Sequence, residues 1–488
     1  MTTNNFFKSY IHYSIYFICA IFYAFAIDIS FPDDGLRHIA FSFNKDIMIS
    51  WGNVYPNSLF TNYDPWFGWH YLLHSLMIFV PYEKIHILIN TMSLFCLSIL
   101  IDKHIRKYSK YDFSSLLYII VFILTMLTSF RYVMLRPDLL SGLYVMTALL
   151  FANRFLFIFV ITILFIPFYY LFFLYTGAIG LVYLIQKKFK AFWGVFIASF
   201  LGLGFHLLYN FDGYLDTVFN ILTDQKLRMG LAVKEGVPLF DILDGINYYV
   251  LLGVFLTTSF SLIYFKYNYF KSNSLALFLL ITSILWVNQY RYFHLFLPLI
   301  TIFVFVSITN MNKKVFFYSL RKYFLIGKRY FNFSKNKKLF YIIAIPYSLL
   351  MLSYIFSSQS LTKTVEEGKY FKNKIFENKT ILSNKMDGDM FKAHYYNPTL
   401  KLIPSCSIGW FDDKNIEMKR IYIKLQNSQK QISENELKKL IDYTNTDYYL
   451  HYFGNSKKLN FNKLNSLGII AKEMDEKKIL FVINKEKK

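Results

Sequence analysis

The stretch IHYSIYFICAIFYAFAIDISFPDDGLRH, residues 11–38, decides how the rest of the chain is interpreted. An apolar run long enough to cross a bilayer leads directly into polar chain, and two adjacent carboxylates, an arginine and a histidine follow. The run has no small-residue cleavage site, so we expect an uncleaved signal anchor rather than a secretory signal peptide. The polar residues after it would then lie at a membrane surface.

Apolar runs of this kind recur along most of the 488 residues. Charged residues make up only 17% of the chain, against about 25% in soluble domains, and the mean hydropathy is +0.33. The pattern predicts an α-helical polytopic membrane protein with about eleven transmembrane helices. We place the spans at 11–29, 84–101, 113–130, 138–152, 155–168, 170–185, 191–209, 247–265, 273–287, 294–309 and 339–357.

The net charge of +22 is distributed in short basic clusters between the apolar runs, such as residues 102–110, 186–190 and 313–338. Basic loops mark the cytoplasmic side of a membrane protein, so the charge does not call for nucleic acid as a partner. The same rule places the N-terminus in the cytoplasm and the first loop outside. We expect an integral protein of a bacterial inner (plasma) membrane.

A long polar tail follows the last predicted span. We divide the chain into a transmembrane domain, 1–357, and a small extracytoplasmic α/β domain, 358–488. SENELKKLIDY (433–443) opens with a capping box and predicts a helix. Strand patterns occur at 380–384, 447–453 and 478–484.

The first outer loop, 30–83, contains two amphipathic segments. Apolar residues recur at helical spacing over 36–47, and 66–80 is apolar but short for a span, so we expect two helices lying on the membrane surface. Pro-Asp-Asp-Gly is good turn chemistry and Asp is a good N-cap, which gives Asp33 and Asp34 a structural explanation. A turn or an N-cap needs only one of the two acids, and it needs neither the arginine nor the histidine that follow them.

Four short segments are predicted to share the outer side. They are DDGLRHIAFSFN (33–44), WGNVYPNSLFTNYDPWFGWHYLLHSL (51–76), RPDLLSGLYV (136–145) and QYRYFHLFLPLI (289–300). Their order and common side resemble the membrane glycosyltransferases of the GT-C class, and the likeness in layout extends over nearly the whole chain. The resemblance implies a polyprenyl-phosphate-linked sugar as donor, and a glycan, lipid or protein as acceptor.

In that class an acid in the first outer loop acts as catalytic base, and Asp34 and Asp33 are the positions that match. We favour Asp34, at the start of the expected surface helix. The base takes the proton of the acceptor hydroxyl, and attack opposite the leaving group inverts the anomeric centre. We expect no cofactor to be required, although a divalent cation held by the two acids stays open as an alternative.

Several arginines fall at outer ends of spans, where the positive-inside rule disfavours them. Arg131, Arg136 and Arg291 could meet the leaving phosphate with planar donor pairs, and the structural alternative is snorkelling to lipid headgroups. Other candidates for substrate contact are Arg37, Asp64, Trp66, His70, Tyr290, Lys226 and Arg228. For Lys226 and Arg228 the alternative is a solvated loop, and for Asp64, Trp66 and His70 it is a structural role.

Two other functions compete with glycosyl transfer. A transporter or flippase of lipid-linked sugars predicts internal repeats and ionisable residues near the bilayer midplane, which the sequence hardly shows. An O-antigen-polymerase-like enzyme of envelope glycan synthesis would act on the same side without an acid after the first span. Membrane lipids are expected partners in each case.

Overall fold

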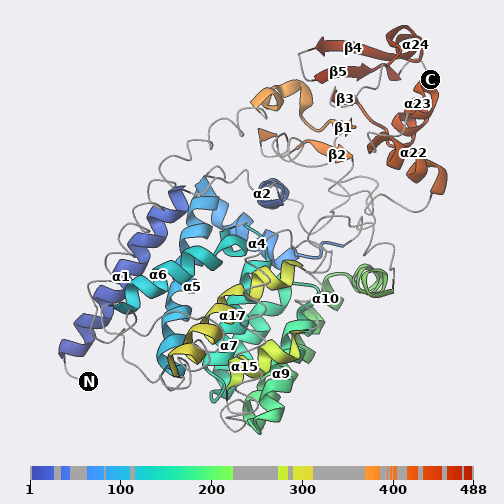
Figure 1. Cartoon of the computed structure of the whole chain (residues 1–488). Helices are drawn as coiled ribbons and strands as arrows, with labels where there is room; N and C mark the ends of the chain where they lie inside the picture. The colour runs from blue at the N-terminus through green and yellow to red at the C-terminus, as the bar shows by residue number, and fades with distance from the viewer. Residues whose placement is uncertain are drawn as a thin grey trace, which may run out of the picture.

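The computed structural model describes residues 3–26, 34–43, 63–81, 84–109, 116–133, 135–223, 273–283, 290–310, 369–384, 393, 396–397, 399–403, 415–426, 432–452, 459–474 and 478–485. Within them, a helical bundle is followed by a small domain built on a mixed sheet (Figure 1). This agrees with the predicted order of a helical part and a C-terminal α/β part. The predicted boundary at 357/358 lies outside the described residues and stays a prediction.

The described part of the bundle consists of α-helices and two short 3-10 helices. They are α1 (Thr3–Ala26), α2 (Asp34–Phe43), α4 (Phe67–Met77), α5 (Ile85–Tyr108), α6 (Leu116–Thr128), η2 (Phe130–Val133), α7 (Asp138–Leu150), α8 (Phe155–Phe165), η3 (Ile166–Phe168), α9 (Phe172–Ile185), α10 (Phe189–Thr223), α15 (Ser274–Ile281) and α17 (Tyr290–Asn310). The two helices predicted on the membrane surface correspond to α2 and α4.

Two described helices, over Ile85–Tyr108 and Phe189–Val218, are long and apolar enough to cross a membrane by length and composition. Six shorter apolar helices coincide with other predicted spans. The predicted spans 247–265 and 339–357 lie outside the described residues, so the total of about eleven stays a prediction.

The break predicted within 155–186 is present. Pro167 lies in η3, between α8 and α9. Proline lacks the N–H that a continuing helix needs, so the helix is interrupted there. The predicted end of the next span near residue 209 matches a bend in α10 at Asn210, whose backbone is extended (φ −164°, ψ 101°). The Asn210 side chain accepts the Gly213 N–H at 2.8 Å, which restarts the helix beyond the bend.

Of the basic clusters predicted to share one side, those at 102–110 and 186–190 are largely described and lie at one end of the bundle, whereas 313–338 lies outside the described residues. Lys107 Nζ donates to the carbonyls of Leu149 and Leu150 at 2.9 and 2.8 Å, so the last turn of α5 lies beside the end of α7. Tyr183 Oη donates to Ala148 O at 2.6 Å and brings the end of α9 to the same place. Which side of the membrane this end faces stays a prediction.

Among the described residues of the C-terminal domain, five strands form a sheet in the order β2-β1-β3-β5-β4. The strands are β1 (Thr380–Ser383), β2 (Lys401–Ile403), β3 (Tyr448–Tyr452), β4 (Ile469–Met474) and β5 (Lys478–Ile483). β1 is parallel to β2 and β3, whereas β5 is antiparallel to β3 and β4. The three predicted strands are confirmed as β1, β3 and β5, while β2 and β4 were not predicted.

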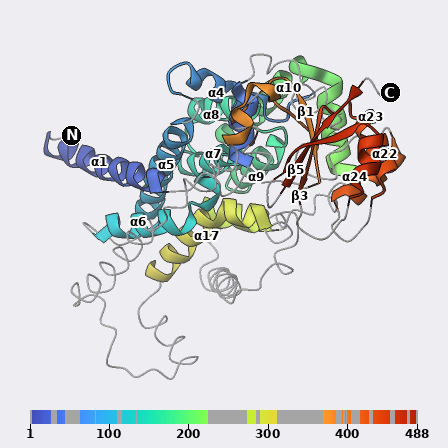
Figure 2. The same ribbon diagram turned by 90° about the horizontal axis from the view of Figure 1, so that it is seen from above.

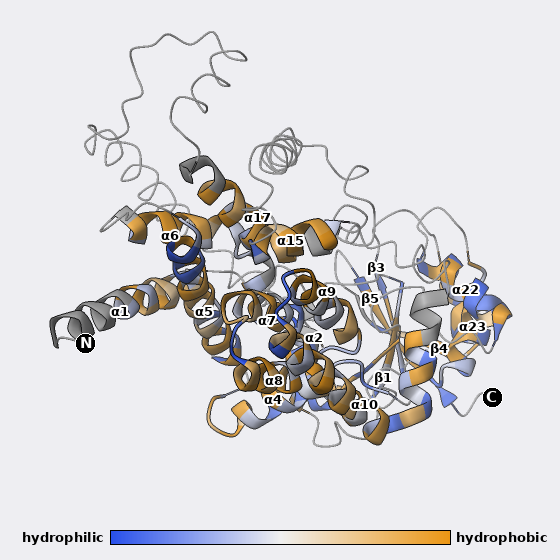
Figure 3. Cartoon of the chain, turned by 90° about the horizontal axis from the view of Figure 1, so that it is seen from below, coloured by the Kyte–Doolittle hydropathy of each residue, from blue (hydrophilic) through white to orange (hydrophobic). Residues whose placement is uncertain are grey.

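Helices and short turns cover the two faces of this sheet. The helices are α22 (Ile416–Gln426), α23 (Glu434–Tyr443) and α24 (Phe461–Ser466), and the turns are η5 (Lys369–Lys372) and η6 (Lys374–Phe376). Figure 2 shows the helices gathered on the side of the sheet away from α1. Figure 3 shows more polar residues on these helices than on the mostly apolar helices of the bundle.

One sheet face also receives a side chain from the first outer loop. Successive strand residues point to opposite faces. Tyr449 accordingly packs with the domain's own helices, and Leu450 packs with Phe371, Phe376 and Phe41. Phe41 belongs to α2 and is fully buried in this cluster. The helix that begins at Asp34 therefore connects the bundle to the C-terminal domain.

α4 packs so closely on η3 that only glycine fits between them. A Cβ built at Gly68 would lie 2.6 Å from Pro167 O. We therefore expect Gly68→Ala to destabilise the protein by about 1–3 kcal/mol, because the clash outweighs alanine's better helix propensity. The measurement is thermal unfolding of the detergent-purified chain.

Gly177→Ala in α9 is the matched control, since a Cβ there would meet nothing within 4 Å. Its Tm should equal or exceed that of the wild type. Equal Tm values for the two variants would contradict the close approach of α4 to η3.

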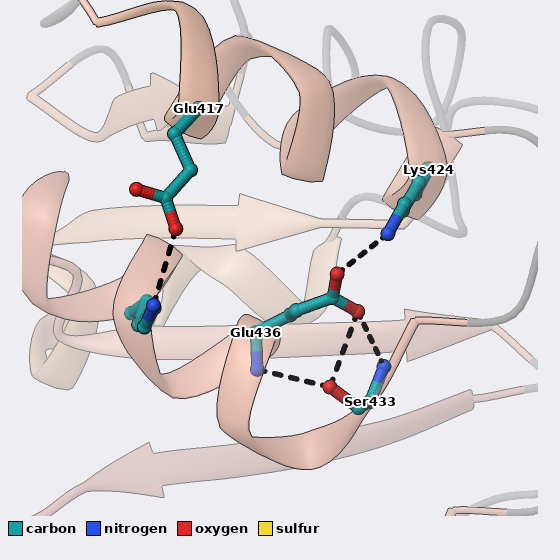
Figure 4. A network of polar contacts seen from close by, with 5 residues as sticks. Glu417, Lys424, Ser433 and Glu436 are labelled. Carbon is teal, nitrogen blue, oxygen red and sulfur yellow. Dashed lines mark hydrogen bonds and ion pairs between the residues drawn. The ribbon is translucent and has the colours of Figure 1, made fainter.

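The capping box predicted at 433–443 is present, and Glu436 lies between Ser433 and Lys424 of the neighbouring helix (Figure 4). The Lys424 ammonium donates to Glu436 at 2.6 Å, and together with the Ser433 N–H it lowers the pKa of this carboxyl. A depressed folded-state pKa stabilises the fold above the unfolded-state pKa, and this stabilisation disappears as pH falls through the folded-state value.

Glu436→Gln should therefore lower the opening free energy of α23 by about 0.5 kcal/mol near neutral pH. The difference from wild type should vanish in acid. Hydrogen exchange over residues 434–443, corrected for intrinsic rates, measures both quantities. Lys439→Gln is the control, because both side chains of its ion pair with Glu417 are exposed. If Lys439→Gln lowers the opening free energy of α23 as much as Glu436→Gln does, the stabilising role assigned to Glu436 is wrong.

Candidate active site

The turn that precedes α4 is built around the Asp64 carboxylate. Asp64 Oδ1 accepts the Trp66 N–H at 2.9 Å, and Oδ2 accepts Nδ1–H of His70 at 2.5 Å. Both side chains of the Asp64–His70 pair are fully buried. The sequence placed these residues on either side of Pro65-Trp66, and the first turn of α4 brings them into contact.

A second histidine extends this pair to α2. His38 Nδ1 lies 2.7 Å from His70 Nε2, and the His38 ring stands edge-on to Trp66 with centroids 5.4 Å apart. A separate contact joins the same two helices, because His74 Nδ1–H donates to the Ser42 carbonyl at 2.9 Å. α2 is therefore held on α4 at two places one helical turn apart.

Asp34 is the first residue of α2, the position predicted for an acid at the helix start. Its side chain and that of Arg37 fall outside what the structure describes, and so does the whole of Asp33. His38 follows Asp34 by one helical turn, which puts the two residues on the same face of α2. The Asp64–His70 pair thus contacts, through His38, the helix that carries the predicted base.

The predicted arginines come from segments that pack on each other. Tyr132, next to Arg131 in η2, donates its hydroxyl to Leu295 O in α17 at 2.9 Å. Arg291 lies one turn before Leu295 at the start of α17, beside Tyr290. The side chains of Arg131, Tyr290 and Arg291 lie outside the description, as do Lys226 and Arg228 entirely.

Arg136 is described and is almost completely buried, just before α7. Its carbonyl accepts the Leu139 N–H, which starts that helix. Gly142, one turn further, has no room for a Cβ because the Tyr132 ring lies against it. The Arg136 backbone is thereby fixed against η2.

The acid and the arginines belong to the same end of the bundle. Val133 of η2 packs with Ala20, Ala24 and Leu94, and Ser129 Oγ donates to Tyr23 Oη at 3.2 Å. These contacts put η2 beside the end of α1, from which the chain leads to Asp34. This end is opposite to the one where the basic clusters meet.

A second buried pair, Tyr63 with His206, was not predicted from the sequence. His206 Nε2–H donates to Ile166 O at 3.0 Å, so its Nδ1 accepts the Tyr63 hydroxyl proton at 2.7 Å. Burial raises the pKa of Tyr63 above its ordinary value, which keeps this donor protonated. Phe67 stacks on Tyr209 beside the pair, with centroids 4.5 Å apart. The start of α4 is therefore fixed to α10.

Among the described side chains, no cluster of three or more His, Cys, Asp and Glu residues suits a metal ion. Both nitrogens of His70 are engaged in hydrogen bonds. The acids to which the sequence assigned a cation, Asp33 and Asp34, are not among those side chains, so a cation there stays a prediction.

No protein-family model and no curated protein matches the chain. A solved structure does: the archaeal oligosaccharyltransferase AglB from Archaeoglobus fulgidus, in complex with an inhibitory peptide and a dolichol-phosphate. The TM-score is 0.55, with 12% identity, over 91% of this chain and 70% of that chain. This chain therefore shares its fold with that oligosaccharyltransferase. The resemblance suggested by the four outer segments is confirmed at the level of the fold.

Tyr63→Phe tests the buried pair that fixes α4. Removing the hydroxyl leaves His206 Nδ1 buried without its donor, which should destabilise the protein by about 1–3 kcal/mol. Thermal unfolding in detergent gives the change. Tyr71→Phe, at an exposed position of the same helix, should leave Tm unchanged, and equal Tm values for the two variants would rule out the bond.

Proposed function

We propose that the protein is a membrane glycosyltransferase that moves a sugar from a polyprenyl-phosphate donor to an acceptor outside the cytoplasm. The GT-C-like fold over 91% of the chain carries the proposal. AglB, which shares this fold, was solved with a dolichol-phosphate and a peptide. A lipid-linked donor, and a glycan, lipid or protein acceptor, fit that precedent.

Asp34 serves as the base in this proposal. Its position at the start of α2 puts it at the end of the bundle that holds η2 and Arg136. The acceptor hydroxyl gives its proton to the carboxylate as its oxygen attacks the anomeric carbon. The bond from that carbon to the phosphate oxygen breaks, and the electron pair leaves with the phosphate. A single displacement of this kind inverts the anomeric centre.

Arginines stabilise the departing phosphate. Arg136 is held almost out of water before α7, where an ionic hydrogen bond to a phosphate is stronger than in solvent. Arg131 and Arg291 are proposed to join it, because η2 packs on the first turns of α17. Charge stabilisation of this type contributes about 3–4 kcal/mol to lowering a barrier.

The orientation follows from the two ends of the bundle. The end with Lys107 and the carbonyls it caps faces the cytoplasm of a bacterial inner membrane, in accord with the positive-inside rule. The end with Asp34 then faces outward, together with the C-terminal domain.

Trp66, which is partly exposed, remains a candidate for stacking on a sugar ring. No cofactor is required, and a divalent cation at Asp33 and Asp34 is testable by chelation.

Asp34→Asn and Asp33→Asn test the base. Loss of a general base should lower kcat by about 10²–10⁴-fold in Asp34→Asn, and Asp33→Asn should lose less. The measurement is loss of radiolabelled sugar from undecaprenyl-phosphate glucose and dolichyl-phosphate mannose, in proteoliposomes supplied with host membrane extract as acceptor. The exposed Asp216 on α10 provides the control Asp216→Asn, which should keep full activity. Full transfer by both variants would eliminate Asp33 and Asp34 as the base.

A further inference from the structure

The helix α10 has two parts, which meet at the bend at Asn210. Its first part, residues 189–209, rises about 32 Å at 1.5 Å per residue. That length already matches the roughly 30 Å of a bilayer's hydrocarbon core, so the second part, residues 211–223, is not needed for a membrane crossing. The second part is seen almost end-on in Figure 1, in green at the right, and from the side in Figure 2, so it runs across the bundle rather than along it.

One face of the second part packs on the protein. Tyr214 and Thr217 lie three residues apart on this face, and each is only 4% exposed. The Tyr214 ring stands edge-on to that of Tyr63, with centroids 5.7 Å apart. At Gly213 the approach is so close that an added Cβ would lie 2.8 Å from the Tyr63 Cβ. Because Tyr63 directly precedes Asp64, the second part of α10 is fixed against the turn before α4.

Two other faces of the second part are exposed, and they differ in polarity. Phe211 and Leu215 lie four residues apart on one of them and are 55% and 45% exposed. Asp212 and Asp216 are exposed too, and each follows an apolar residue by one position, about 100° further round the helix. A helix that lies in a membrane surface has this arrangement, because its apolar face enters the lipid while its charged face stays in water.

The apolar face also continues the lipid-exposed surface of the first part. Phe200, Phe205 and Leu208 are large apolar side chains of the first part, and all three are exposed, as expected of a helix surrounded by lipid. Leu208 is 89% exposed and comes just three residues before Phe211. The exposed apolar surface therefore extends across the bend, and the molecule that covers the first part can cover Phe211 as well.

We infer that the second part of α10 is an interfacial helix, with Phe211 and Leu215 in the acyl region of the bilayer and Asp212 and Asp216 in water. Through its contact with Tyr63, the helix then holds the turn before α4 at the depth of the lipid headgroups. This placement does not depend on the proposed glycosyl transfer, because it follows from packing and exposure alone. In the proposed reaction, the same depth is where the phosphate of a lipid-linked donor lies.

Nitroxide spin labels measure the depth of each face. The three native cysteines, Cys19, Cys96 and Cys406, are replaced by serine, and the labelled full chain is reconstituted into phosphatidylcholine–phosphatidylglycerol vesicles. The labelled sites are Phe211→Cys, Leu215→Cys, Asp212→Cys and Asp216→Cys. Labels at 211 and 215 should collide mostly with O2, which concentrates in lipid, at a depth of about 5–10 Å. Labels at 212 and 216 should collide mostly with a water-soluble nickel chelate, so that the ratio of the two collision rates differs several-fold between the faces.

Two further sites calibrate the measurement. Phe200→Cys on the first part provides the lipid reference, and Glu417→Cys, exposed on α22, provides the water reference. If the labels at 211 and 215 behave like the label at 417, water covers the apolar face and the interfacial helix is wrong. Protection of both labels from both reagents would reveal a protein occupant, such as a second copy of the chain, and would overturn it equally.

The Tm of each labelled variant in vesicles shows whether it is folded. Phe211→Trp keeps an aromatic side chain, and it decides the question if the labelled apolar sites unfold. The fluorescence that it adds to that of the wild type should be quenched by lipids brominated near the headgroup end of their acyl chains. Quenching would support the interfacial helix, and unquenched fluorescence would overturn it. Neither result requires the protein to transfer a sugar, so this test and that of the proposed function can fail separately.

Discussion

The arrangement around the candidate site depends on one hydrogen bond, from Nδ1 of His70 to the carboxylate of Asp64. It closes the turn before α4 onto the first turn of that helix, and it leaves His70 Nε2 free to accept from His38 of α2. A buried carboxylate is tolerated only where its lone pairs are satisfied. Here the Trp66 N–H and the His70 ring satisfy them. Loss of either partner would leave a charge in the protein interior and loosen the helix that carries Asp34.

α2 is fixed from both sides. On the bundle side, His38 and the carbonyl of Ser42 are bonded to α4, while α4 itself rests on η3 through Gly68. On the other side, Phe41 is buried among side chains of the C-terminal sheet. A movement of the C-terminal domain would therefore be transmitted to the helix of the candidate base. Such rigid support is what a catalytic group needs if it is to meet its substrate in one orientation.

Features with a local physical cause were predictable. Pro167 interrupts the helical run between α8 and α9, and Ser433 with Glu436 forms a capping box from residues three apart. The acid at the start of α2 and the breaks between apolar runs follow from the same kind of local rule. β2 escaped prediction because it is only three residues long, and β4 because it follows the helix α24 almost directly, through Gly468, which adopts a positive φ of 78°.

The sequence by itself determined the succession of apolar runs and the grouping of the basic clusters at 102–110 and 186–190 at one end, and it predicted acids and arginines for the other end. Only the tertiary structure decided that His38 meets His70, that Tyr63 meets His206, and that Phe41 enters the C-terminal sheet. The reason is physical. Helix period and turn chemistry act between near neighbours in the chain, whereas these contacts join residues far apart and leave no periodic signal. They form only when apolar packing has brought their helices together.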